Sequence, residues 1–145
     1  MWIVVVCICA GCVTVKIPKY LKEEFPYKKR FYADFDETLK ATQQALKDTG
    51  WVMTEIVNPS LYEQNQAGES SEKQVLIFTE VRQTPLIFSS RYMSLNLYLR
   101  TTGDATDVEI RYLAITPMLF KNSESYKNEE VISKIFNRIS QLLEK

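Results

Sequence analysis

Histidine is absent from the 145-residue chain, and cysteine occurs only at Cys7, Cys9 and Cys12. The missing imidazole excludes Ser-His-Asp and Cys-His catalysis, histidine general bases and every histidine-containing metal site. Because no cysteine follows Cys12, thiolate-bound zinc, iron–sulfur clusters and internal disulfides are excluded from the rest of the chain. No pair of acidic residues is spaced for a carboxylate hydrolase. We therefore expect a protein that is not an enzyme, with no catalytic residue, metal or cofactor.

The chain also lacks an excess of charge of either sign, since 18 Lys and Arg balance 18 Asp and Glu. A neutral balance argues against nucleic acid as a partner, because such binders carry a basic excess. Glycine (4) and proline (5) are scarce, which favours a folded chain over a disordered one. The length predicts a single domain with one core.

The first eleven residues carry no charge and open with an apolar run that ends at the small residues Ala10 and Gly11. An apolar run this short does not span a bilayer as a helix, which needs about 20 residues. Signal peptides have shorter apolar cores, and small residues precede their cleavage site. The pattern predicts a signal peptide over residues 1–11. The alternative is a buried apolar strand with incidental cysteines.

The tetrapeptide "CAGC" at residues 9–12 resembles the lipobox of bacterial lipoproteins, in which small residues precede an obligatory cysteine. The resemblance implies that Cys12 is lipidated and becomes the first residue of the mature chain. Val13 stands where inner-membrane lipoproteins tend to carry Asp, so the resemblance implies anchoring to the outer membrane, on its periplasmic side. Several acyl chains on Cys12 would anchor the protein firmly.

Residues 12–30 read as this lipidated cysteine followed by a basic tether. Pro18 and Pro26 disfavour a helix there. The tether carries a net charge of +4, from two glutamates and six basic residues: Lys16, Lys19, Lys22, Lys28, Lys29 and Arg30. Either the tether lies against anionic headgroups, where each basic residue contributes about 1 kcal/mol, or it is a soluble spacer. As a flexible coil it would reach roughly 25 Å.

The remaining residues, 31–145, read as a single domain with a helix near each end. Asp34 and Glu37 form a capping-box-like pair at the start of a helix over residues 32–51, and Gly50 is a C-terminal cap. Asn128 is a plausible N-cap for a second helix over residues 128–145, which carries one broad apolar stripe. These end signals predict that both helices pack on a common core.

Four strands are predicted between the two helices, at residues 51–57, 74–82, 91–100 and 108–116. The order α-β-β-β-β-α predicts an α+β fold, in which a four-stranded antiparallel meander has both helices packed on one face. Residues 28–33 are a candidate for an extra edge strand, and a long polar loop is expected at residues 58–73.

The stretch "RYMSLNLYLR" (91–100) alternates apolar and polar side chains. Met93 and the following leucines point to one face, whereas Tyr92, Tyr98 and Arg100 point to the other. Aromatic and arginine side chains are enriched at protein interfaces, so these three are candidate partner-binding residues. The alternative is an ordinary solvated sheet face.

Two near-copies, "TPLIF" (84–88) and "TPMLF" (116–120), each follow a predicted strand. Proline is tolerated at a strand end because its missing N–H is not needed there. The apolar residues that follow, including Phe88 and Phe120, are either core plugs at the ends of the sheet or an exposed patch for a partner or a bilayer.

The stretch "FDETLKATQQALKDTGWVMTEIV" (35–57) reads as a helix, a Gly-aromatic pair and a strand. In this order the chain resembles small bacterial outer-membrane lipoproteins with a helix-grip-like α+β domain, such as the accessory lipoprotein of the β-barrel assembly machine. The resemblance implies a non-enzymatic accessory or scaffold subunit of an envelope protein assembly, with protein partners in the cell envelope and a lipid anchor in the membrane. The alternative is a binding module for a small apolar ligand or lipid between the sheet and the helices.

Overall fold

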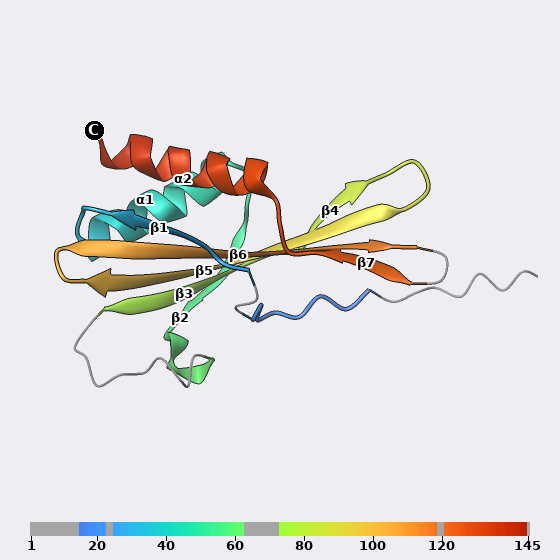
Figure 1. Cartoon of the computed structure of the whole chain (residues 1–145), viewed down its shortest axis with the longest axis horizontal. Coiled ribbons are helices and arrows are strands. Elements are labelled where there is room, and N and C mark those ends of the chain that lie inside the picture. Colours follow the sequence, from blue (N-terminus) through green and yellow to red (C-terminus); the bar gives the residue numbers. More distant parts are fainter. Residues whose placement is uncertain (1–14, 23–24, 63–72, 119–120, 145) are drawn as a thin grey trace, which may run out of the picture.

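The computed structural model describes residues 15–22, 25–62, 73–118 and 121–144, which form an α+β fold (Figure 1). In these residues seven strands form one antiparallel sheet and two helices pack on one of its faces. The expected α+β class is confirmed, whereas the expected number of four strands is wrong. The elements are β1 Tyr27–Phe31, α1 Phe35–Asp48, β2 Met53–Val57, the 3-10 helix η1 Pro59–Leu61, β3 Gln74–Thr79, β4 Arg82–Pro85, β5 Ser90–Thr102, β6 Ala105–Pro117, β7 Asn122–Ser125 and α2 Glu129–Leu143.

A long central hairpin organises the sheet. Strands β5 and β6 have 13 residues each and pair from Tyr92 opposite Ile115 to Thr102 opposite Ala105. Gly103 has a φ of 63° in the two-residue turn between them, a conformation that glycine adopts without steric cost. The hairpin thus spans the whole molecule, and every other strand pairs with part of its length except β2, which pairs with β3.

The strands beside the central hairpin change along its length. At the end near Gly103 the order is β2-β3-β5-β6-β1, while at the other end β4 pairs with β5 and β7 pairs with β6. The strand expected over residues 74–82 is therefore two strands, β3 and β4, interrupted at Glu80 and Val81. Strand β7 was not expected at all. Both β4 and β7 consist largely of exposed polar residues, so neither shows the apolar alternation from which strands are predicted.

Both helices begin as the sequence indicates. Asp34 Oδ1 accepts the Glu37 N–H at 2.8 Å, and Asn128 Oδ1 accepts the Val131 N–H at 3.1 Å. Gly50 follows α1 with a φ of 80°. The helices pack over the half of the sheet that contains β1 to β3, and the hairpins formed by β4–β5 and β6–β7 extend beyond them (Figure 1). The core between helices and sheet contains fully buried Leu46, Leu95, Leu97, Leu99, Val108, Ile110, Ile135 and Ile139.

The opposite face of the sheet is also covered. Residues 15–22, here called the strap, run across this face toward β7 (Figure 1). Val15, Ile17 and buried Leu21 pack against Leu113 and Ile115 of β6. The strap and most of β1 belong to residues 12–30, which the sequence analysis assigned to a tether. In the structure the strap packs on the sheet, and β1 is one of its strands.

Candidate functional site

Two buried polar side chains hold the strap to the sheet. Asn96 of β5 and Arg111 of β6 lie directly opposite each other. Asn96, which is 0% exposed, accepts the Leu21 N–H at 2.5 Å and donates through Nδ2 to the Lys19 carbonyl at 3.1 Å. Arg111 Nη1 donates to the Leu21 carbonyl at 3.2 Å and to the Tyr20 hydroxyl at 3.0 Å. These side chains satisfy backbone groups of the strap, which would otherwise be buried unpaired.

Around this clamp, aromatic and charged contacts fix the rest of the strap. The rings of Tyr20 and Tyr62 stack with centroids 5.2 Å apart, and Tyr62 packs edge-on against Phe78 of β3. Lys19 Nζ lies 2.6 Å from Glu55 Oε2 on β2. The strap is therefore a docked second layer on this part of the sheet.

Tyr98 lies on the face that the sequence predicts, but it is 3% exposed. It packs with Leu76 and Phe78, and its hydroxyl donates to Gln74 Oε1 at 2.7 Å. Tyr92, on the same face, is half-buried. The alternation of β5 identifies this face correctly, yet it cannot reveal that a distant segment covers it.

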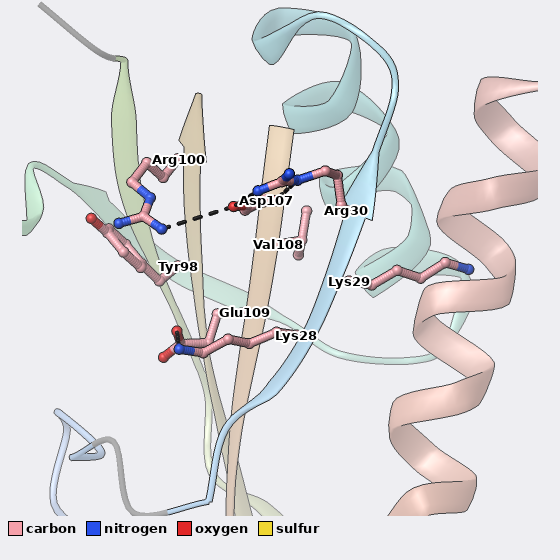
Figure 2. Close-up of a pocket in the computed structure, with 8 residues that line it drawn as sticks. All are labelled: Lys28, Lys29, Arg30, Tyr98, Arg100, Asp107, Val108 and Glu109. Atoms are coloured by element: carbon pink, nitrogen blue, oxygen red, sulfur yellow. Dashed lines mark hydrogen bonds and ion pairs between the residues drawn. The ribbon is translucent and has the colours of Figure 1, made fainter. Parts of the chain in front are cut away.

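Arg100 lines a hollow of about 470 Å³ between β1, β5 and β6, on the same face as the strap. Figure 2 shows Arg30 and Arg100 approaching Asp107 from opposite sides. Arg30 binds both carboxylate oxygens of Asp107, at 2.7 and 3.0 Å, while Arg100 Nη2 is 3.8 Å away. The hydrogen bond from Arg30, aided by one from Thr102 Oγ1, lowers the pKa of Asp107 below its ordinary value.

The second carboxylate of the hollow is paired as well. Glu109 accepts a hydrogen bond from Arg111 Nε at 2.6 Å, and its Oε2 lies 3.2 Å from Lys28 Nζ. Lys29 points away from the hollow toward α2, where its Nζ donates to Ser140 Oγ at 2.9 Å (Figure 2). With both carboxylates engaged by cations, the hollow has the chemistry of a structural ion-pair network rather than that of a proton-transfer site.

At the far end of β5, the β4–β5 hairpin ends in apolar side chains that contact water. Ile87 is 90% exposed and Phe88 is 98% exposed, and Leu86 beside them is half-exposed. The Leu86 N–H donates to the Ser89 carbonyl at 2.8 Å, which closes a tight two-residue tip. Of the two alternatives for this segment, the exposed patch is the one that the structure shows.

A backbone hydrogen bond also joins the last residues described on either side in the β6–β7 hairpin. The Met118 N–H donates to the Lys121 carbonyl at 2.9 Å, and Met118 is also half-exposed. The two "TP" segments are thus equivalent in place, because each ends a strand at the same end of the central hairpin. Phe120 and the proposed lipidation site Cys12 lie outside the described residues.

The described candidate residues do not form one site. Phe88 lies two residues before β5 begins, and Arg100 lies two residues before β5 ends. About 40 Å of extended strand therefore separates the two residues. The sequence analysis missed the clamp formed by Asn96 and Arg111. The available signal was a pair of polar side chains in the middle of two strongly apolar, alternating strands.

Within the described ranges, no cluster of acidic side chains is arranged to bind a metal, and no helix has the length and apolar character needed to cross a membrane. No model of a known protein family matches the chain, and no curated protein is significantly similar to it.

Proposed function

We propose that the protein is a lipid-anchored periplasmic lipoprotein of the bacterial outer membrane and acts as a non-enzymatic accessory or scaffold subunit of an envelope protein assembly. The observation that carries this proposal is the docked strap. Its first described residue, Val15, follows Cys12 by three positions. Three residues span at most about 11 Å, so acyl chains on Cys12 would hold the folded domain directly at the bilayer.

The fold suits a scaffold better than an enzyme. The carboxylates of the hollow are neutralised by cations, and both faces of the sheet are covered by packed layers. A protein of this kind presents surfaces in a fixed orientation, because a docked strap sets how the domain sits relative to its anchor. A flexible tether of roughly 25 Å would not do so.

The test is intact-mass analysis of the chain expressed in a Gram-negative bacterium. We expect the wild-type protein in the outer-membrane fraction, beginning at an acylated Cys12. Cys12→Ser should abolish acylation and cleavage, while Cys7→Ser, the matched control within the apolar run, should preserve both. An unmodified polypeptide from Met1 to Lys145 in the cytosol would contradict the anchoring.

The scaffold role requires a second measurement. Affinity purification of the tagged protein from detergent-solubilised membranes should recover larger envelope proteins in defined stoichiometry. Mass spectrometry of the same material for a bound apolar ligand tests the alternative role as a binding module. Recovery of the acylated protein alone would contradict the scaffold role and leave the anchoring intact.

A further inference from the structure

We propose that the tip of the β4–β5 hairpin forms a second membrane contact, which inserts Ile87 and Phe88 into the interface of an anionic lipid bilayer. The inference rests on the proposed function for its cellular setting. The contact itself is a property of the described residues and does not require the acyl chains.

The tips have the exposure that such a contact needs. Ile87 and Phe88 are adjacent, nearly fully exposed and located at the extremity of a hairpin that extends beyond the helices (Figure 1). Leu86 and Met118 add two half-exposed apolar side chains at the same end of the sheet. Two large apolar residues at the point of a two-residue turn have no role in packing the domain, so their exposure indicates a contact outside it.

The charge around the tips favours a lipid surface with anionic headgroups. Arg91 and Lys121 belong to the two hairpins, and no Asp or Glu occurs between residues 81 and 103 or between residues 110 and 123. Glu124, the acidic residue that ends this second range on β7, accepts a hydrogen bond from the Tyr126 hydroxyl at 2.9 Å. Exposed apolar residues flanked by basic ones are typical of segments that bind membrane interfaces.

With Cys12 acylated as proposed above, the course of the strap also favours a bilayer at this end. From Leu21, which is held beside the middle of β5 by Asn96, the strap runs to Val15 and Ile17 beside Leu113 and Ile115. Ile115 lies opposite Tyr92, close to where β4 and β7 join the central hairpin. A bilayer that received acyl chains within about 11 Å of Val15 would therefore face the hairpin tips.

The test is co-flotation with vesicles of the chain from residue 12 carrying Cys12→Ser, which contains every described residue and no acylation site. We expect it to float with vesicles that contain phosphatidylglycerol and to remain behind with purely phosphatidylcholine vesicles. Added salt should weaken the binding. The double variant Ile87→Ser/Phe88→Ser should bind at least tenfold more weakly, at an unchanged melting temperature because both side chains are exposed.

The matched control is Leu61→Ser, which removes an exposed leucine from η1, away from the hairpins. It should float like the parent. Equal flotation of the double variant, equal flotation with neutral vesicles, or no flotation of the parent chain would each overturn the proposal. None of these results bears on Cys12, so they would not contradict acylation found by intact-mass analysis. Conversely, an absence of acylation would not change the interpretation of the vesicle experiment.

Discussion

At the scale of single residues, the clamp formed by Asn96 and Arg111 decides how the second face of the sheet is covered. Both side chains are buried in the middle of the longest strands. Their polar atoms bind the backbone of Lys19 and Leu21, so they specify one register of the strap on the sheet. An apolar pair would allow the strap to bind but would not fix its register.

The first prediction concerns this clamp. Asn96→Leu leaves the buried Leu21 N–H and Lys19 carbonyl without the hydrogen bonds that Asn96 makes to them. We expect the free energy of unfolding to fall by about 1–3 kcal/mol, measured by urea denaturation. Asn122→Leu on β7, where the side chain is exposed, should change it by less than about 0.5 kcal/mol. Equal effects of the two substitutions would contradict the assigned role of Asn96.

The second prediction concerns the pH dependence of stability. Arg30 lowers the pKa of Asp107 in the folded protein, so the ionised carboxylate favours folding. This contribution is fully present above the unfolded-state pKa of about 4 and is lost as the pH falls through the lower folded value. Asp107→Asn should therefore destabilise the protein at pH 6 and weaken the loss of stability below about pH 4.

The measurement for Asp107 is the urea midpoint as a function of pH, from about pH 6 to pH 2.5. Glu80→Gln, which neutralises an exposed carboxylate between β3 and β4, is the control and should follow the parent curve. Parallel curves for Asp107→Asn and the parent would show that the ion pair with Arg30 has no net effect on folding.

Sequence patterns predicted part of this residue-level chemistry. The caps Asp34 and Asn128 were predictable because a cap is local, lying within three residues of the N–H that it accepts. The burial of Tyr98 was not, because it depends on Tyr20 and Tyr62, which are far from it along the chain. Alternation assigns a side chain to a face, but it carries no information about what covers that face.

At the scale of elements, the lengths of β5 and β6 explain the three strands that the sequence did not clearly specify. A hairpin of two 13-residue strands has long outer edges of N–H and C=O groups that need partners, and β3 covers only part of the β5 edge. Strand β4 pairs with Ser90–Met93 of β5, and the β6 edge is shared by β1 and β7. Strands β4 and β7 bury few side chains and depend on backbone hydrogen bonding, which is why apolar patterns predict them poorly.

The third prediction belongs to α2. Ile139 is fully buried in the core between helices and sheet, so Ile139→Asp places an unpaired carboxylate among apolar side chains. We expect a loss of about 4 kcal/mol or more, sufficient to unfold the domain, which circular dichroism would detect. Asn137→Asp, an exposed substitution on the same helix, should melt within a few degrees of the parent. A parent-like melt for Ile139→Asp would refute the packing of α2.

At the scale of the whole molecule, the central hairpin joins two parts that differ in how many layers cover the sheet, here called the body and the thin end. In the body, the sheet lies between two helices and the layer formed by the strap and η1. At the other end, β4 and β7 are exposed along most of their length. A rigid body that carries a less protected, apolar-tipped end is suited to holding one orientation at a surface.

This difference in thickness leads to the fourth prediction. Amides of Leu95–Leu99 in β5 lie under both layers, so they should exchange hydrogen only when the whole domain unfolds. Amides of Arg82–Thr84 and Asn122–Ser125 should open locally and exchange at least about 100-fold faster. Native-state hydrogen exchange at residue resolution measures the rates of both groups of amides. Low urea concentrations should accelerate exchange of the Leu95–Leu99 amides more than that of the β4 and β7 amides, since global unfolding exposes more surface. Uniform protection along the central hairpin and its neighbours would mean that the two ends unfold as one unit, and the thin end could then not adapt to a bilayer independently of the body.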